Sequence, residues 1–337
     1  MRRRWFLYSG AAVFLAVVSV TVWMAWSLLH PAVPDGAPAH IFVVPEGVGL
    51  ADVAARLERQ GLIKSGNAFV LWARIAGSSR SIKAGEYSLS PAMPPVKILE
   101  YLRRGILMTH PVTIPEGMGL REIGGLLAGL DLVDEGAFIS YCLNPKTAES
   151  YGLNFPGLEG FLYPDTYRFS KGLPVRVMVD VMVKRFFEKI GPLKGRIEQT
   201  GMSLDQAVIL ASIIEKETGS ASERPLIASV FLNRIDKGMR LQSDPTAVYD
   251  IVDFEGPITR KELRRRSAYN TYMVTGLPPG PICNPGLDSV LAVLDPAQTD
   301  YLYFVSKNDG THHFSKSLKE HNAAVQKYQR RSAGRSS

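Results

Sequence analysis

Two glutamates at the end of one apolar segment are the residues of this chain best suited to acid–base chemistry. Residues 203–219 are almost wholly apolar until Glu215 and Glu217. At about 100° per residue, Glu217 lies beside Leu210 on the apolar side of a helix, whereas Glu215 points well away from it. A carboxyl group pressed against Leu and Ile side chains has its charged form disfavoured, so its pKa rises above the roughly 4.3 of a free glutamate. Glu217 is therefore the candidate general acid.

The alternative is a solvated pair of glutamates at a frayed helix end, since most glutamates are exposed. The helix itself is well marked. Ser203 with Gln206 three residues later forms a capping-box signature, and Gly219 supplies the left-handed residue that commonly ends a helix. The sequence thus predicts a helix between Ser203 and Gly219. It does not decide whether the two glutamates are buried or solvated.

The neighbouring segments predict a mixed α+β catalytic domain with a helical core. Amphipathic patterns predict helices over residues 175–190 and 222–237, and Gly238 closes the second of them. Two late strands are predicted at residues 301–305 and 313–315, across a turn that contains Gly. These elements would hold the glutamate helix in place.

Two loops rich in Tyr, Asn, Pro or Thr follow, at residues 241–249 and 267–272. Loops of this kind often line clefts. Tyr rings stack on the apolar faces of sugars, while Asn, Gln and Thr side chains hydrogen-bond to sugar hydroxyls. A carboxylic acid beside such a cleft fits acid catalysis on a polysaccharide.

The amino-terminal segment predicts a membrane anchor. Arg2, Arg3 and Arg4 precede an uncharged, mostly apolar run over residues 5–29, which exceeds the about 20 residues needed to cross a bilayer. By the positive-inside bias, the N-terminus lies in the cytoplasm and the rest of the chain outside. A cleaved signal peptide is the alternative, because residues 37–39 read Ala-Pro-Ala, but the apolar run is too long for an ordinary signal peptide.

A pattern of strand, turn and helix occurs twice in the chain. The β-branched and aromatic residues 41–44 lead through Pro-Glu-Gly at residues 45–47 into a helical stripe. The same pattern returns 70 residues later, around Pro-Glu-Gly at residues 115–117. It predicts two related small α+β units.

Charge and cysteine content narrow the classes of function. The net charge is +7, from 39 basic and 32 acidic residues. With most of the chain expected outside the cytoplasm, no nucleic acid partner is expected, and an anionic lipid or wall polymer fits the charge better. The two cysteines, Cys142 and Cys283, either pair in an oxidising compartment or remain packed thiols.

Other catalytic chemistries lack support in the sequence. The chain has no His-Glu-x-x-His, Cys-x-x-Cys or calcium-loop pattern, so neither a metal site nor a cofactor is expected. Gly-x-Ser-x-Gly and a Walker-type phosphate loop are also absent. A surface turn and helix explain the grouping of His312, His313 and His321. Nothing in the sequence near Cys283 would lower its pKa.

Six motifs stand in order along the predicted catalytic portion. They are Ala-Ser-Ile-Ile-Glu-Lys-Glu-Thr at 211–218, Ala-Ser-Glu-Arg at 221–224, Asn-Arg at 233–234, Gly-Met-Arg-Leu-Gln-Ser-Asp-Pro-Thr at 238–246, Ala-Tyr-Asn-Thr-Tyr at 268–272 and Gly-Leu-Pro-Pro-Gly-Pro-Ile at 276–282. Together they closely resemble the YceG-like family of endolytic murein transglycosylases. The resemblance covers nearly the whole chain, including the anchor and a LysM-like portion around residues 41–104.

The resemblance implies cleavage of the MurNAc-(β1,4)-GlcNAc bond in nascent peptidoglycan without water, leaving a 1,6-anhydro-muramyl end. The family's catalytic glutamate falls on Glu217, the one followed by Thr218, in agreement with its place on the helix. Glu217 would first protonate the glycosidic oxygen and then take the proton of the muramyl C6 hydroxyl as that oxygen attacks C1. One carboxyl then serves both steps, whereas ordinary glycosidases need a second carboxylate.

The matching segments also supply candidate substrate-binding residues. We expect some of these to line a glycan groove: Glu223, Gln242, Asp244, Thr246, Tyr269, Asn270 and Tyr272. Each has a structural alternative, since Asp244 can cap a turn, Glu223 can occupy a first helical turn and Asn270 can brace a loop. Glu159 is a reserve candidate for a second acid, with bracing of the fold as its alternative.

The predicted organisation has six parts. They are a cytoplasmic N-terminus (residues 1–4), a transmembrane helix (5–29), a linker (30–39), a LysM-like α+β domain (40–108), a catalytic transglycosylase domain (109–328) and a disordered tail (329–337). The expected location is the cytoplasmic (inner) membrane, with a single crossing and an extracytoplasmic catalytic part. Expected partners are peptidoglycan glycan strands and, by resemblance, peptidoglycan synthases, with limitation of strand length as the role. A hydrolytic muramidase and a non-catalytic glycan-binding scaffold remain open.

Overall fold

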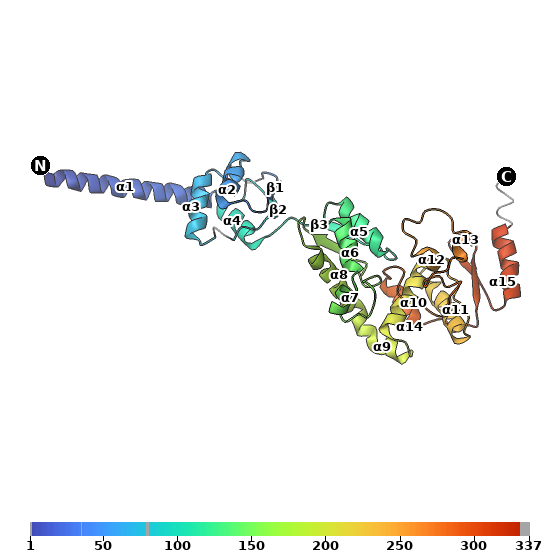
Figure 1. The fold of residues 1–337 in the computed structure, drawn as a ribbon. Helices are drawn as coiled ribbons and strands as arrows, with labels where there is room; N and C mark the ends of the chain where they lie inside the picture. Colours follow the sequence, from blue (N-terminus) through green and yellow to red (C-terminus); the bar gives the residue numbers. More distant parts are fainter. Residues whose placement is uncertain (1, 35, 79–80, 331–337) are drawn as a thin grey trace. The chain divides into compact units, whose positions relative to one another are not determined.

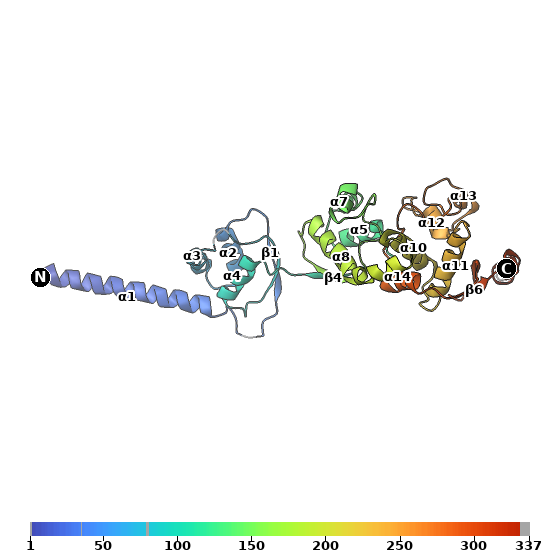
Figure 2. The same ribbon diagram turned by 90° about the horizontal axis from the view of Figure 1, so that it is seen from below.

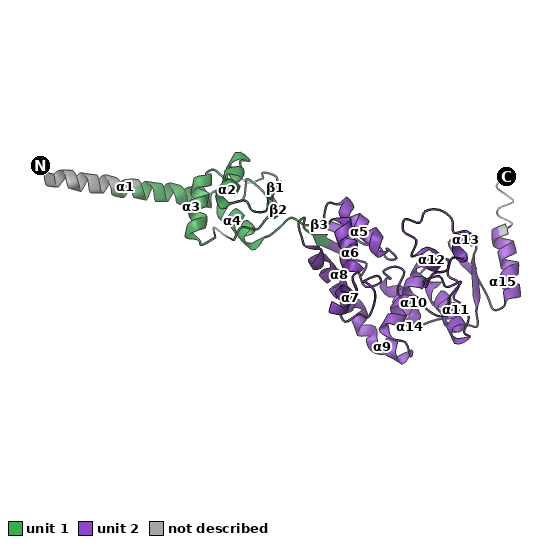
Figure 3. Ribbon diagram, viewed as in Figure 1, with its two compact units in different colours: residues 1–110, 168–172 green, residues 111–167, 173–337 purple. Residues whose placement is uncertain are grey.

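The computed structural model describes residues 2–34, 36–78 and 81–330, and the side chains of all of these except residues 2–13, 16 and 330. It has two compact units, residues 1–110 with 168–172 and residues 111–167 with 173–337 (Figure 3). Helices predominate, and the strands of the described residues form three two-stranded sheets. The fold is α+β, as predicted.

The first unit builds one core from a two-stranded sheet and helices (Figure 1). Its elements are α1 (Arg2–Leu29), β1 (His40–Val44), α2 (Leu50–Arg59), α3 (Gly66–Ile75), β2 (Gly85–Leu89) and α4 (Pro95–Arg104). The two strands pair antiparallel, with Phe42 opposite Tyr87. Side chains alternate between the faces of a strand, so Phe42 and Val44 are buried while Ile41 and Val43 remain about half exposed.

The predicted membrane span of residues 5–29 lies within α1. Its first part, residues 5–13, lies outside the residues whose side chains are described. Among the residues that could be searched, we find no helix with the length and apolar character that a membrane span requires.

The remaining elements form a mainly helical arrangement with four short strands, which pair into two two-stranded sheets. They are β3 (His110–Thr113), α5 (Leu120–Gly129), α6 (Glu135–Cys142), α7 (Pro145–Ser150), β4 (Thr166–Phe169), α8 (Val175–Ile190), α9 (Lys194–Gln199), α10 (Leu204–Glu217), α11 (Arg224–Asp236), α12 (Asp244–Val248), α13 (Arg260–Leu263), α14 (Leu287–Leu294), β5 (Tyr303–Ser306), β6 (His312–Ser315) and α15 (Leu318–Val325). Helix α10 is central, because it contacts α9, α11, α12 and α14 (Figures 1 and 2).

Several predicted elements are confirmed. Helix α8 has the predicted bounds, α11 is followed by Gly238 with a left-handed φ of 64°, and β5 and β6 pair antiparallel. The repeated strand–turn–helix pattern is also present. Each of its turns contains a left-handed glycine, Gly47 with a φ of 74° and Gly117 with a φ of 78°, where a side chain would be strained.

Other elements were not predicted. Helices α6, α7, α9 and α14 have only six to eight residues each, too few to display a clear helical stripe in the sequence. The predicted loop at residues 241–249 contains the short helix α12. A helical turn, Gln326–Arg330, extends into the stretch predicted as a tail, and residues 331–337 lie outside the described residues. Cys142 and Cys283 are both buried and unpaired with each other.

Candidate active site

Helix α10 begins as the sequence predicts. The Ser203 hydroxyl accepts a hydrogen bond from the Gln206 backbone N–H at 3.2 Å, and the Gln206 side chain accepts one from the Ser203 N–H at 3.0 Å. Every residue from 207 to 214 is buried. The helix is thus enclosed along most of its length, and this fixes the direction in which its last turn points.

The end of α10 differs from the prediction. The helix stops at Glu217, and the next residue, Thr218, is extended with a φ of −148°. Gly219 is not in the left-handed conformation that was expected of it. Thr218 is buried and its hydroxyl accepts a hydrogen bond from the Ser220 N–H at 3.0 Å, so a local side-chain turn, and not a glycine cap, follows the helix.

Glu217 lies in the wall of a pocket of about 430 Å³. The Ser243 hydroxyl donates a hydrogen bond to its Oε1 at 2.5 Å. Burial raises the pKa of Glu217 to about 7 against the opposing effect of the Ser243 hydrogen bond, while the negative charge of Asp244 raises it and the positive charge of Arg234 lowers it. Near pH 7 such a carboxyl can donate a proton and, once ionised, accept one.

Glu215 is also withdrawn from solvent, so the alternative of a solvated pair of glutamates does not hold. Its side chain is 5% exposed and accepts hydrogen bonds from Arg224 Nη2 at 3.0 Å and from the Gly286 N–H at 2.9 Å. Arg224 also lies 3.5 Å from the Glu116 carboxylate. Glu215 is therefore committed to an ion pair that joins α10 to the start of α11, and Glu217 is the one that faces the pocket.

The Glu217 pocket is formed by side chains of several elements. The following residues line it: Glu217 from α10, Arg234 from α11, Leu241, Gln242 and Asp244 before and in α12, Tyr272, four residues of β5, His312 from β6, and Leu318, His321, Val325 and Gln329 from the C-terminal helical region. Aromatic rings and hydrogen-bonding groups both occur among them. This mixture suits a sugar, which has apolar faces and hydroxyl edges.

Three of the seven predicted binding residues line this pocket together with Glu217. They are Gln242, Asp244 and Tyr272. The Tyr272 hydroxyl donates to Asp244 Oδ1 at 2.5 Å. Gln242 has a φ of 53°, in the left-handed region that non-glycine residues seldom adopt. Residues with such backbone strain cluster at functional sites, so the conformation of Gln242 agrees with its place in the wall.

Two of the other predicted residues brace loops instead of lining the pocket. Thr246 is fully buried and its hydroxyl donates to the Ser243 carbonyl at 2.6 Å. Asn270 is also fully buried, and its Nδ2 donates to the Arg265 carbonyl at 2.7 Å. Thr246 thus supports the residue that contacts Glu217, and Asn270 has the bracing contacts that were its alternative.

The last two predicted residues, Glu223 and Tyr269, do not line the pocket either. Glu223 accepts hydrogen bonds from the backbone N–H of His312 at 2.8 Å and from its Nδ1 at 2.7 Å, so it holds one pocket-lining residue of β6. The Tyr269 ring lies against the Tyr249 ring, with centroids 4.7 Å apart. Glu223 thus supports the pocket wall from behind, and Tyr269 packs against a residue that is not part of the wall.

Sequence reasoning missed Arg234, Ser243 and Tyr303, and it assigned His321, which lines the pocket, to a surface turn and helix. Arg234 donates to the Leu241 carbonyl at 2.6 Å, and its guanidinium lies 5.1 Å from the centroid of the Tyr303 ring. The His321 ring stacks on Tyr303 at 5.3 Å. Arg234 belongs to a quoted motif, and it falls on the same helical face as Val230 and Phe231, so a charged residue on an apolar face was a signal that could have identified it. The contacts of the other three residues depend on long-range packing.

Comparison with known proteins places the chain in a family. Residues 42–327 match the model of the YceG-like family. The chain belongs to the YceG-like family. This YceG-like chain is 33% identical to the endolytic murein transglycosylase of Bacillus subtilis (strain 168), over 90% of this chain and 88% of that protein. It is 29% identical to the endolytic murein transglycosylase of Streptococcus pneumoniae serotype 2 (strain D39 / NCTC 7466), over 93% of this chain but 63% of that protein's length.

A solved structure is similar to the YceG-like chain as well. It is the 2.6 Å crystal structure of a protein described as yceG-like, from Listeria monocytogenes. The similarity has a TM-score of 0.60 with 32% sequence identity and covers 86% of this chain and 100% of the other.

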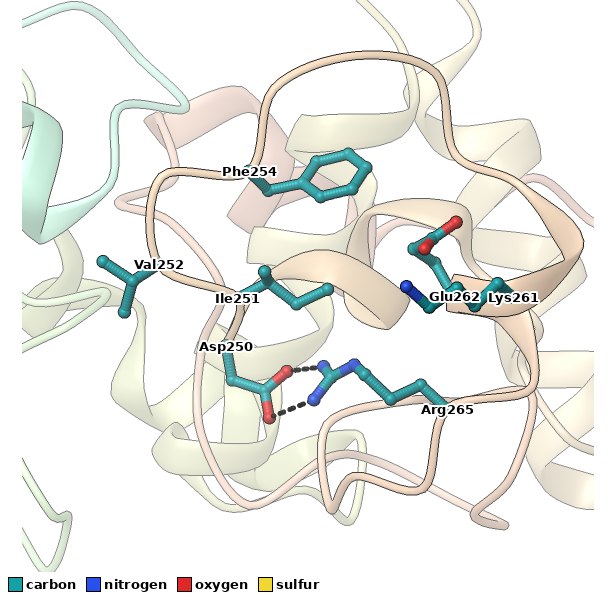
Figure 4. Close-up of a pocket in the computed structure, with 7 residues that line it drawn as sticks. All are labelled: Asp250, Ile251, Val252, Phe254, Lys261, Glu262 and Arg265. Carbon is teal, nitrogen blue, oxygen red and sulfur yellow. Dashed lines mark hydrogen bonds and ion pairs between the residues drawn. The ribbon is translucent and has the colours of Figure 1, made fainter.

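A second pocket, of about 730 Å³, lies beyond the carboxyl end of α12 in the YceG-like chain (Figure 4). The Asp250 carboxylate is hydrogen-bonded to the Arg265 guanidinium and accepts from the Ser267 hydroxyl at 2.6 Å. The Glu262 carboxylate accepts from the Thr259 N–H at 2.9 Å. Both carboxylates of this pocket thus already have partners, so the Glu217 pocket is the better candidate for acid catalysis.

Glu159, the reserve candidate for a second acid, does not lie beside Glu217, and no metal site is found in the described part of the YceG-like chain. Within residues 2–34, 36–78 and 81–330, no group of three or more His, Cys, Asp or Glu side chains is arranged to hold a metal ion. Glu159, the reserve candidate, is 9% exposed and does not line the Glu217 pocket. Its contacts lie with α5, Asn284 and Tyr249.

Proposed function

We propose that this protein is an endolytic peptidoglycan lytic transglycosylase, which cleaves the MurNAc-(β1,4)-GlcNAc bond of nascent glycan strands and leaves 1,6-anhydro-MurNAc ends. The observation that carries the proposal is the Glu217 carboxyl, whose pKa burial raises to about 7 in the wall of an aromatic and polar pocket. The relatives named endolytic murein transglycosylase support the same substrate class. Termination of strand elongation is the physiological role that we propose.

Glu217 acts twice in this reaction. Protonated Glu217 donates its proton to the glycosidic oxygen, and the bond from that oxygen to C1 breaks. The resulting carboxylate takes the proton of the C6 hydroxyl while O6 forms the new bond to C1, so the proton lost in the first step is recovered in the second. Among the described residues, the hydrogen bond to this carboxyl comes from Ser243 and occupies Oε1. Oε2 is thus left to exchange the proton with the sugar.

Asp244 is the other carboxylate among the residues that line the pocket. A hydrolytic muramidase would need such a second carboxylate, about 5–5.5 Å from the acid if retaining or about 6.5–9.5 Å if inverting. The Tyr272 hydroxyl is hydrogen-bonded to Asp244, which favours a binding role over a nucleophilic one. A substitution of Asp244 therefore distinguishes a hydrolytic muramidase from a lytic transglycosylase.

The first experiment identifies the products. Purified glycan strands are incubated with the full chain in detergent and the products are analysed by mass spectrometry. We expect anhydro-ended fragments from the unchanged protein, none from Glu217→Gln, and the same fragments from the exposed control Glu255→Gln. Reducing-end products would assign hydrolysis. If the unchanged protein binds glycan strands but cleaves none, the result would support the non-catalytic glycan-binding scaffold instead.

Asp244→Asn completes this test. A transglycosylase needs no second carboxylate, so the variant should still yield anhydro-ended fragments, at a rate reduced by about 10-fold because substrate contacts are disturbed. Complete loss of cleavage in Asp244→Asn, together with reducing-end products from the unchanged protein, would assign the two-carboxylate mechanism.

We also propose that the chain has the membrane anchor, domains and partners that the sequence predicts. Residues 5–29 anchor the chain in the cytoplasmic membrane, and Arg2, Arg3 and Arg4 keep the N-terminus in the cytoplasm. Residues 40–108 act as a LysM-like domain, and residues 109–328 as the catalytic domain. Peptidoglycan synthases are the protein partners that fit an enzyme acting on new strands.

A further inference from the structure

Glu159 is a buried carboxyl group that the proposed reaction does not use. The Leu120 N–H donates to both of its oxygens at 3.0 Å, Asn284 Nδ2 donates to Oε1 at 3.1 Å, and the Tyr249 hydroxyl donates to Oε2 at 3.1 Å. All three partners act as donors, and a carboxylate is the side chain that accepts from all of them at once. Glu159 thus joins three segments that are distant in the sequence.

One of these segments leads directly to the Glu217 pocket. Tyr249 follows the last residue of α12, a helix of only five residues. The residue before α12 is Ser243, which donates to Glu217, and its first residue is Asp244, which lines the pocket. A helix of this length spans about 7.5 Å, so a displacement at its end is transmitted to its beginning.

The neighbouring contacts fix the same helix from other sides. Asp250, next to Tyr249, is hydrogen-bonded to Arg265 and Ser267, as Figure 4 shows for the arginine. At the other end, the Ser243 N–H donates to the Thr271 hydroxyl at 2.9 Å. Glu159 adds a further support at the end of α12, through the Tyr249 hydroxyl.

We propose that Glu159 is a positioning residue for catalysis: through Tyr249 it fixes the end of α12, and thereby holds Ser243 and Asp244 against Glu217 and the substrate. The proposal rests on the proposed function for its kinetic consequences. The effect on the position of α12 does not depend on that function and can be tested separately.

The surroundings of Glu159 also make its protonation state matter. Burial raises its pKa to about 7, against the hydrogen bonds from Leu120 and Tyr249, and the negative charge of Glu122 on α5 acts in the same direction as burial. Burial raises the pKa of Cys142 on α6, of Cys283, and of Tyr249 and Tyr269, so these four groups are neutral near pH 7. Protonation of Glu159 below pH 7 removes an acceptor from three donors and loosens α12.

The test compares three variants of the full chain. Glu159→Gln replaces an accepting oxygen by an amide that donates, and Tyr249→Phe removes only the hydroxyl. Tyr151→Phe is the matched control, because the Tyr151 hydroxyl also donates to a carboxylate, Asp180, at 3.1 Å. Hydrogen exchange of the peptide covering residues 243–249 should become faster in the first two variants and stay unchanged in the control.

The kinetic readout separates positioning from folding. We expect kcat on glycan strands to fall by about 10- to 100-fold in Glu159→Gln and Tyr249→Phe with little change in KM, and the acidic limb of the pH profile to disappear in Glu159→Gln. Unchanged exchange of residues 243–249 in both variants overturns the proposal, whether or not the protein is an enzyme. Activity lost only in proportion to the unfolded fraction overturns it too. Absence of cleavage by the unchanged protein would instead refute the proposed function.

Discussion

At the scale of single residues, the surroundings give two neighbouring glutamates different properties. Glu215 is paired with Arg224 and accepts from the backbone of Gly286. Glu217, two residues later, faces a pocket with one hydroxyl donor, and burial raises its pKa to about 7. A buried carboxyl that has no ion-pair partner favours its neutral form. The same residue type thus provides a structural ion pair at one position and a candidate acid at the other.

Ser243→Ala should move the pH dependence of the reaction. The Ser243 hydrogen bond lowers the pKa of Glu217, so its removal raises that pKa further. Because the first step needs protonated Glu217, activity falls as pH rises through this pKa. We therefore expect the alkaline limb of kcat/KM to move to higher pH by about one unit. A pH series of initial rates measures the shift.

The control for this prediction is Ser222→Ala, since Ser222 is exposed and its hydroxyl contacts Ser220. It should leave the limb where it is. An alkaline limb that stays fixed, or moves to lower pH, in Ser243→Ala would assign that limb to a group other than Glu217.

At the scale of elements, a tight turn supports α10 from the side. Gly160 has a φ of 87°, and a Cβ atom at this position would lie 2.5 Å from Pro281 Cγ and 3.1 Å from Val208 Cγ1. Val208 belongs to α10, the helix that carries Glu217. Glycine is required here for two reasons, the left-handed backbone and the close approach of neighbouring groups.

Gly160→Ala should destabilise the fold by about 2 to 5 kcal/mol, because the strained backbone and the overpacking both add to the cost. Gly201→Ala is the matched control. Gly201 has a φ of 80° but nothing within 4 Å of an added Cβ, so it should lose about 1 to 2 kcal/mol from backbone strain alone. Urea unfolding of the two variants measures the difference, and equal losses would show that the contacts of Gly160 do not matter.

At the scale of the whole molecule, the chain combines two compact units that have separate cores. The first is built around β1, β2 and the helices packed on them, and the second around α10. The Glu217 pocket is made entirely of residues from the second unit. The proposed anchor and the proposed catalytic site therefore belong to different units.

Deletion of residues 1–29 should release the protein from the membrane. The deleted run has no charged residue after Arg4. Its burial in the lipid bilayer is the interaction that would hold the protein at the membrane, and the deletion removes it. Cell fractionation should find the full chain with the membrane and most of the shortened chain in the soluble fraction. Deletion of residues 331–337 is the control and should leave the protein at the membrane. Recovery of the full chain in the soluble fraction would contradict the anchor.

The sequence by itself determined the local elements. The cap of α10 at Ser203, the bounds of α8 and the two glycine turns follow from contacts within a few residues, which a pattern of residue types can report. It also predicted the α+β class, and it selected Glu217 as the candidate acid, a residue that lines a pocket in the structure. For the end of α10, the predicted glycine cap was wrong, because the chain already leaves the helix at Thr218 in an extended conformation.

Only the tertiary structure decided which side chains surround the glutamates. Ser243 lies 26 residues from Glu217, and Asn284 lies 125 residues from Glu159. The sequence left open whether Glu215 is solvated, and the packing of Arg224 against it decided that point. Thr246 and Asn270 resemble binding residues in the sequence, yet packing directs their side chains into the fold. The physical reason is that a helical period sets which face a residue occupies, while the partner on that face depends on how the elements pack together.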